Sequence, residues 1–183
     1  MEPYEGINAY VFVEDAHEAD LDRIRDLVGG GSADMAEGAP GMRAVGILNG
    51  PYDAIAAVSV DTLDELHRIV MEHIRGGQSP KTDTAIALRP FLRPIPMSPD
   101  LPPVVAFVRV KVERGRGEEV LDAVESISGF VGAVLVAGSF DLLLEFGRNS
   151  VDEVAAVLRD ELQAIDGIAS TVTSIAGEVV HPG

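Results

Sequence analysis

The chain contains no cysteine and no tryptophan, and each absence narrows the chemistry open to it. Without cysteine there is no disulfide, no thiolate nucleophile and no cysteine-based zinc or iron–sulfur site. His67 and His73 share an expected helix, but a separation of six residues puts them about 240° apart around it. We therefore expect neither a metal site nor a bound cofactor. Three Tyr and six Phe are the only aromatic residues, which disfavours a pocket for an aromatic substrate.

Long hydrophobic runs are missing as well. The longest strongly apolar stretch, about Phe130 to Phe140, is shorter than the ~20 residues that a membrane helix needs. The N-terminus, Met1 to Glu5, is acidic and lacks the basic-then-apolar pattern of a signal peptide. We expect a cytoplasmic protein that does not contact a membrane.

Positive charge is scarce, because 14 Lys and Arg stand against 30 Asp and Glu, for a formal net charge of -16. Such a surface repels the phosphates of nucleic acids, so direct DNA binding is not expected. The acidity suits either a basic partner or simple solubility, and both interpretations stay open. Hydrophobic residues make up 46% of the chain, which is ample for a buried core.

Proline is concentrated in one segment. Residues 90–103, with the sequence PFLRPIPMSPDLPP, hold six of the eleven prolines of the chain. Such a run favours extended polyproline geometry over helix or central strand. We interpret it as a linker between a first module, residues 1–89, and a second module, residues 104–183.

The two halves are similar once Tyr52-Asp53 is placed over Phe140-Asp141. In this register each half has a helix that opens with a capping box, Thr62-x-x-Glu65 in the first and Ser150-x-x-Glu153 in the second. The apolar positions of these helices, spaced by three, four and four residues as on one helix face, also match: Leu63, Leu66, Val70 and Ile74 with Val151, Val154, Leu158 and Leu162. The recurrence indicates a duplication.

The remaining elements give each half the order β-α-β-β-α-β. In the first half we expect a strand at 7–13, a helix at 18–28, a hairpin of 43–48 with 52–60 and a last strand at 82–87. In the second half we expect a strand at 104–112, a helix at 117–127, a hairpin of 131–136 with 140–146 and a last strand at 171–176. Leu142 to Leu144 are apolar at consecutive positions, so both faces of that strand must be covered. We therefore expect an α+β fold in which two ferredoxin-like modules pack as a pseudo-dimer of the dimeric α/β-barrel type.

These residues resemble a known family, the effector-binding module of the Lrp/AsnC regulators of amino-acid metabolism, also called the RAM domain and similar in fold to ACT domains. The second copy carries the pattern in GAVLVAGSFDLLLEF and SVDEVAAVLRDELQAIDGIASTVTSI, and the first keeps NGPYD and TDTAIAL. The first copy also has a longer, Gly-rich connection, Gly29 to Gly41. Family members that bind DNA carry a helix-turn-helix domain ahead of this module, whereas here a strand is expected from Ile7. The resemblance therefore implies effector sensing or assembly without direct DNA reading.

The resemblance also points to the hairpin turns, near which effectors such as amino acids bind in the family. The residues it implies are Gly50, Tyr52 and Asp53 in the first copy and Gly138, Phe140 and Asp141 in the second. An Asp at a turn can hold an α-ammonium group, and backbone amides near glycine can receive a carboxylate. Each Asp can equally cap its own turn through an Asx-type bond, and that alternative stays open. We expect both glycines to allow positive φ.

Three functions follow as hypotheses. The first is a non-catalytic module that senses an amino acid or similar metabolite. The second is a partner-binding or assembly protein for Lrp/AsnC-type regulators, and the third a cofactor-free enzyme of the dimeric α+β barrel type. No Ser-His-Asp arrangement can be assigned from spacing, so we expect no catalytic residue. Exposed strand edges favour a homo-oligomer.

Overall fold

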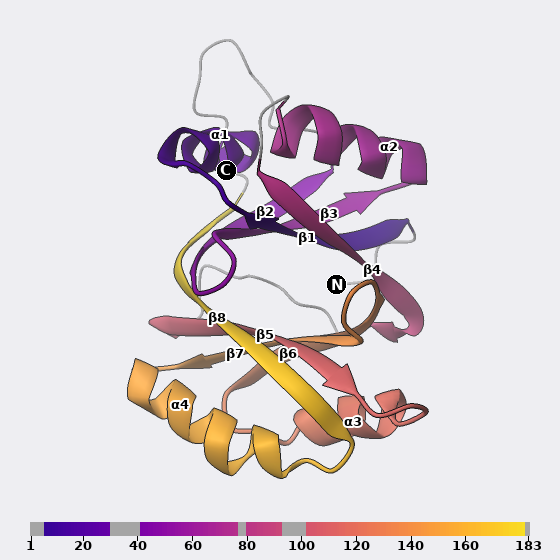
Figure 1. Cartoon of the computed structure of the whole chain (residues 1–183), viewed down its shortest axis with the longest axis vertical. Coiled ribbons are helices and arrows are strands. Elements are labelled where there is room, and N and C mark those ends of the chain that lie inside the picture. Colours follow the sequence, from indigo (N-terminus) through magenta and orange to yellow (C-terminus); the bar gives the residue numbers. More distant parts are fainter. Residues whose placement is uncertain (1–5, 30–40, 77–79, 93–101, 182–183) are drawn as a thin grey trace. The chain divides into compact units, whose positions relative to one another are not determined.

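The computed structural model describes residues 6–29, 41–76, 80–92 and 102–181. Within these ranges it contains eight strands and four α-helices, arranged as two β-α-β-β-α-β modules (Figure 1). This confirms the expected α+β fold class. The described residues divide into two compact units, one holding residues up to Ile86 and from Glu178 onward, the other holding Ala87 to Gly177.

The first module forms an antiparallel sheet with the strand order β4-β1-β3-β2. Its elements are β1 (Ile7–Glu14), α1 (Glu18–Gly29), β2 (Met42–Asn49), β3 (Ala54–Val60), α2 (Leu63–Arg68), the π-helix η1 (Ile69–Ile74) and β4 (Lys81–Leu92). Helices α1 and α2 lie on one face of this sheet (Figure 1). Alternate residues of β1, among them Val11 and Val13, point to this face and form the core with the helices.

The second module repeats the arrangement with the strand order β8-β5-β7-β6. Its elements are β5 (Val104–Val112), α3 (Gly117–Val124), β6 (Phe130–Ala137), β7 (Leu142–Arg148), α4 (Val151–Asp160), the 3-10 helix η2 (Leu162–Ala164) and β8 (Ile168–Val180). Leu142, Leu143 and Leu144 of β7 are each fully buried. The expectation that both faces of this strand are covered is therefore confirmed.

Strand β4 runs further than the sequence suggests. It continues to Leu92, three residues into the segment 90–103 that we interpret as a linker. Residues 93–101 of that segment, and residues 30–40 of the Gly-rich connection, lie outside the described residues. The module boundaries at 1–89, 90–103 and 104–183 stay a prediction.

The expected apolar stripes of the second helices are wrong at their first positions. Leu63 and Val151 are each 59% exposed, because each is the first residue of its helix and burial begins one turn later, at Leu66 and Val154. In the first module the helix also changes to π geometry after Arg68. The wider turn buries Ile69 together with Val70.

The expected capping box is complete in the first of these helices and only half formed in the second. Thr62 accepts a hydrogen bond from the Glu65 amide, and the Glu65 carboxylate accepts in return from the Thr62 amide. Ser150 likewise accepts a hydrogen bond from the Glu153 amide at 3.2 Å. The Glu153 carboxylate, however, accepts from the Asn149 amide and not from that of Ser150. None of the helices in the described ranges has the length and apolarity to span a membrane.

Candidate ligand site at the hairpin turns

The turn between β2 and β3 is fixed by the backbone of Asp53. Its amide donates to the Val13 carbonyl at 2.9 Å, and its carbonyl accepts from the Leu48 amide at 2.9 Å. The Asp53 carboxylate reaches out of the turn, because Oδ2 accepts from the amide of Ala16, 37 residues earlier, at 3.0 Å. Asp53 thus ties the hairpin to the loop after β1 rather than capping its own turn.

Asp141 does the same in the second module. Its amide donates to the Val110 carbonyl at 3.0 Å, and its carbonyl accepts from the Val136 amide at 2.9 Å. Its Oδ2 accepts from the amide of Val112, at the end of β5, at 2.9 Å. In both modules the turn aspartate therefore accepts a hydrogen bond from a backbone amide at the end of the first strand or just after it. Sequence reasoning missed this role because the donor lies in a distant segment.

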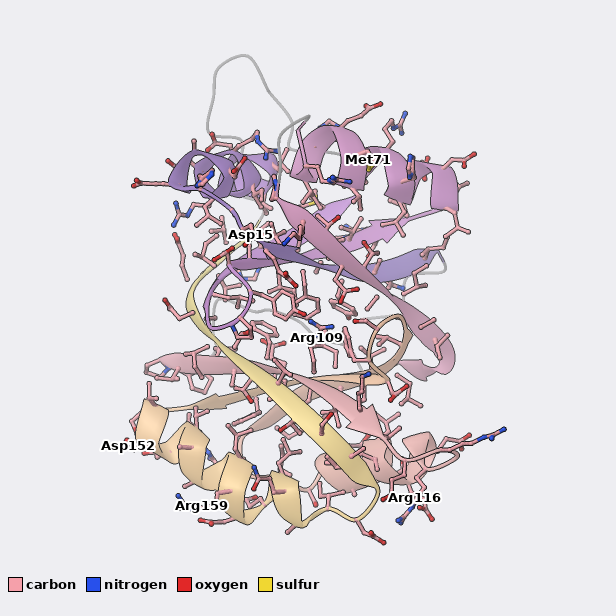
Figure 2. The ribbon with its side chains drawn as sticks, viewed as in Figure 1. Asp15, Met71, Arg109, Arg116, Asp152 and Arg159 are labelled. Atoms are coloured by element: carbon pink, nitrogen blue, oxygen red, sulfur yellow. The ribbon has the colours of Figure 1, made fainter. Side chains whose placement is uncertain are left out.

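The neighbouring aromatic residues have different partners in the two modules. Tyr52 packs against Phe12 of β1, with 5.1 Å between ring centroids and 59° between ring planes. Phe140 lies under the guanidinium of Arg109 of β5, whose Cζ is 4.4 Å from the ring centroid. Arg109 also donates from Nη2 to Ser139 Oγ at 2.5 Å. Arg109 projects from β5 on the sheet face away from α3 and α4 (Figure 2).

Phe12 and Arg109 are equivalent positions, because each precedes the residue whose carbonyl receives the turn amide. The first turn is therefore flanked by an aromatic pair and the second by a cation–π pair, which is stronger when desolvated. Sequence reasoning missed Arg109. The available signal was a charged residue inside the otherwise apolar start of the run VVAFVRVKV.

The two turn glycines differ. Gly50 has a φ of 148°, which supports the expectation that glycine is needed there. Gly138 does not have a positive φ, and neither do Ala137 and Ser139, so the expectation is wrong for the second turn. The second hairpin closes through the Val136–Asp141 bond without a left-handed residue.

A depression of about 550 Å³ opens beside the first turn. It is lined by Glu14, Asp15, Ala16, His17, Pro51 and Asp53. Of the three residues that the sequence singled out in this module, Asp53 lines the depression, whereas Gly50 and Tyr52 do not. The loop after β1 supplies half of the lining residues.

Asp15, labelled on this loop in Figure 2, has an unusual backbone. Its φ is 57°, in the left-handed region that few residues other than glycine adopt. Its Oδ2 lies 2.7 Å from Lys81 Nζ at the start of β4. The hydrogen bond and charge of Lys81 lower the pKa of Asp15, and Asp15 in turn raises the pKa of Lys81. Both side chains are exposed, so solvent weakens the pair.

The lining is chemically suited to a cationic group. Glu14, Asp15 and Asp53 contribute three carboxylates, of which Asp15 is already paired with Lys81. Asp53 Oδ1 has no hydrogen-bond partner among the described residues. An ammonium group offers three donors, and charge-assisted bonds to carboxylates are the stronger kind. In the described part of the chain, no group of three or more His, Asp or Glu is arranged to hold a metal ion.

Comparison with known proteins identifies a matching family and curated relatives. Residues 105–182 match the family model of the Lrp/AsnC ligand binding domain. An uncharacterized HTH-type transcriptional regulator of Pyrococcus horikoshii is 31% identical over 74 residues, which cover 39% of this chain and 49% of that protein. One from Pyrococcus abyssi is 28% identical over 78 residues, covering 41% and 52%. The matched stretch thus spans about half the length of these curated relatives.

Several solved structures share the fold over nearly the whole chain. The siroheme decarboxylase NirDL matches with a TM-score of 0.68 at 10% identity, covering 96% of this chain and 72% of that one. A putative monooxygenase from Lactobacillus acidophilus matches with a TM-score of 0.59 at 10% identity, covering 98% of both chains. Both modules, in this order, therefore form a fold that occurs in other single chains, including enzymes.

Proposed function

We propose that the chain is a non-catalytic regulatory module that binds an amino acid or a similar small metabolite. The proposal rests on the match of residues 105–182 to the family model of the Lrp/AsnC ligand binding domain. It acts in the cytoplasm, as a homo-oligomer, and does not read DNA directly. The net charge of -16 supports the last point, because it opposes approach to phosphates.

The depression beside Asp53 is the observation that carries this proposal. The α-ammonium group of an amino acid donates to Asp53 Oδ1 while Oδ2 keeps its bond to the Ala16 amide. Glu14 adds negative charge on the same wall, whereas the charge of Asp15 is largely offset by its ion pair with Lys81. Gly50 has a backbone conformation that only glycine adopts easily, and it has no side chain. The carboxylate of the ligand can therefore approach the exposed backbone there. Tyr52 stabilises the turn by packing against Phe12 of β1.

The second turn is proposed as a related site with a different balance of charge. Gly138, Phe140 and Asp141 occupy the positions of Gly50, Tyr52 and Asp53. Arg109 adds a guanidinium beside Phe140, so this turn offers a cation as well as a carboxylate. The two turns therefore differ in the ligands that they favour.

A thermal screen tests the proposal. Each common amino acid is added to the full chain at millimolar concentration, because a ligand held at 100 times its Kd stabilises the native state by about 2.7 kcal/mol. One or a few amino acids should raise the melting temperature. Asp53→Asn should reduce that rise, and Asp26→Asn, an exposed site on α1, should leave it intact. No rise with any amino acid would overturn the proposal.

An enzyme is the second candidate, because both full-length structural matches carry enzyme names. At 10% identity these matches speak for the fold only. His17 is the one imidazole on the wall of the depression, so a ligand that is consumed during the screen, with loss of consumption in His17→Gln, would favour catalysis. A ligand that raises the melting temperature and is recovered unchanged favours sensing. The third candidate, assembly with Lrp/AsnC-type regulators, predicts co-purification with such a regulator that no amino acid alters.

A further inference from the structure

The loop that walls the depression is connected to the far end of the second helix of the same module. We propose that Asp20 and Arg23 of α1 are positioning residues that couple this loop, and the occupancy of the depression, to the C-terminal end of η1. This inference rests on the proposed function, because it describes what ligand binding at Asp53 changes.

The first link joins the turn to α1. Asp53 Oδ2 accepts from the Ala16 amide at 3.0 Å, and the next amide, that of His17, donates to Asp20 Oδ2 at 3.1 Å. Asp20 is largely buried, with 12% of its side chain exposed. The His17 amide, followed by the Arg23 guanidinium, lowers the pKa of Asp20. Consecutive amides of one short loop thus bind carboxylates of two different elements.

The second link joins α1 to η1. Asp20 Oδ1 accepts from Arg23 Nη2 at 3.1 Å. Arg23 Nη1 donates a short hydrogen bond to the His73 carbonyl, and Nη2 makes a longer one, 3.5 Å, to the Arg75 carbonyl. The guanidinium therefore donates to carbonyls at the end of the helix, where carbonyl groups lack partners within the helix.

The end of η1 is built around this guanidinium. Gly76 has a φ of 55°, and a Cβ at this residue would lie 2.6 Å from Arg23 Nη1. The Arg75 amide donates to the Val70 carbonyl at 2.9 Å, the five-residue spacing of a π-helix. A π turn is a rare geometry that neighbouring contacts must maintain. Its stability depends on Arg23, and the position of Arg23 depends on Asp20.

The consequence is a direction for the response. A ligand that bridges Asp53 and Glu14 holds the loop in place, which keeps Asp20 and Arg23 aligned and protects the Arg75 amide. Neutralising Asp53 has the opposite effect. It weakens the bond to Ala16, loosens the loop and lets the end of η1 open more often.

Hydrogen exchange of the ligand-free full chain tests the coupling directly. Asp53→Asn should speed amide exchange of residues 69–76, relative to the amides of α4, by about fivefold, the lower end of typical coupling between sites. The same change should have little effect in an Arg23→Gln or Asp20→Asn background. Asp22→Asn is the matched control, because Asp22 pairs with Arg25 on the same helix at 2.6 Å and does not bind Arg23. In that background the fivefold increase should persist.

Two results would overturn the coupling whatever the ligand. One is that Asp53→Asn speeds amide exchange of residues 69–76 equally in all backgrounds, and the other is that it does not speed this exchange when it is the only change. Addition of an equimolar millimolar mixture of the common amino acids separates the two proposals. A rise in melting temperature without slower exchange at residues 69–76 relative to α4 refutes the coupling and leaves ligand binding intact. If the melting temperature does not rise, the proposed ligand binding is refuted. The hydrogen exchange of the ligand-free variants then decides alone whether Asp20 and Arg23 couple the loop to the C-terminal end of η1.

Discussion

At the scale of single residues, the sequence located the turn aspartates but not what they do. Asp53 and Asp141 stand out because the Tyr-Asp and Phe-Asp pairs recur in register. Their bonds to the amides of Ala16 and Val112 join segments 37 and 29 residues apart. No local pattern encodes such a bond, because it depends on how the hairpin packs beside the first strand.

The shared bond predicts a structural cost at both turns. Asp141→Ala should lower the free energy of unfolding by about 1–2 kcal/mol, since the Val112 amide loses a charge-assisted partner. Asp141→Asn, which keeps an acceptor oxygen, should cost less. Urea unfolding of the two variants checks the order. An alanine variant as stable as the parent would show that the bond contributes nothing.

Glycine makes a second prediction at this scale. Gly129 has a φ of 77°, and a Cβ there would collide with the Gly147 carbonyl oxygen. Gly115 has a φ of 83°, but no atom lies within 4 Å of its added Cβ. Gly115→Ala should therefore cost only the left-handed strain, about 1 kcal/mol, whereas Gly129→Ala should cost about 3 kcal/mol or more. Equal losses in urea unfolding would contradict the role of the Gly147 contact.

At the scale of elements, periodicity and capping boxes were enough to place the second helices, but not to describe their geometry. The apolar stripe from Leu63 to Ile74 predicts an ordinary amphipathic α-helix. We attribute the π turn to features that the stripe does not contain, namely the Arg23 bonds and Gly76. Strand β4 was placed from its Thr-x-Thr start, but prolines in its last residues obscured its extension to Leu92.

The Asp20 network predicts a pH dependence of stability. Because the pKa of Asp20 is lowered in the folded chain from its ordinary value of 3.8, its stabilising contribution is present above pH 3.8 and is lost as the pH falls below it. Asp20→Asn should therefore be less stable than the parent at neutral pH. The difference in free energy of unfolding should shrink below pH 3.8. Urea unfolding across this range checks it, and a difference that stays constant with pH would contradict the network.

At the scale of the whole molecule, the sequence predicted the duplication and the order of elements, because repeats, turns and capping boxes agree with one another. The matches over 96% and 98% of the chain, at 10% identity, show that chains with very different sequences adopt this fold. The module boundaries at the Pro-rich segment, residues 90–103, stay a prediction.

The net charge of -16 makes a prediction for the molecule as a whole. Repulsion between carboxylates destabilises the compact state, and salt reduces it as the Debye length falls from about 30 Å at 0.01 M to about 8 Å at 0.15 M. The melting temperature should therefore rise by a few degrees over this range of sodium chloride. A fall would mean that ion pairs such as those of Arg116 outweigh the repulsion.

The most direct test of ligand binding at the first turn is a two-dimensional NMR titration of the isotope-labelled full chain with the amino acids that raise its melting temperature. The amide signals of Ala16, His17 and Asp53 should shift in a saturable way, and Asp53→Asn should abolish the shifts. Asp26→Asn should not. Saturable shifts confined to residues away from both Asp53 and Asp141, or no shifts at millimolar ligand, would contradict a ligand site at the hairpin turns.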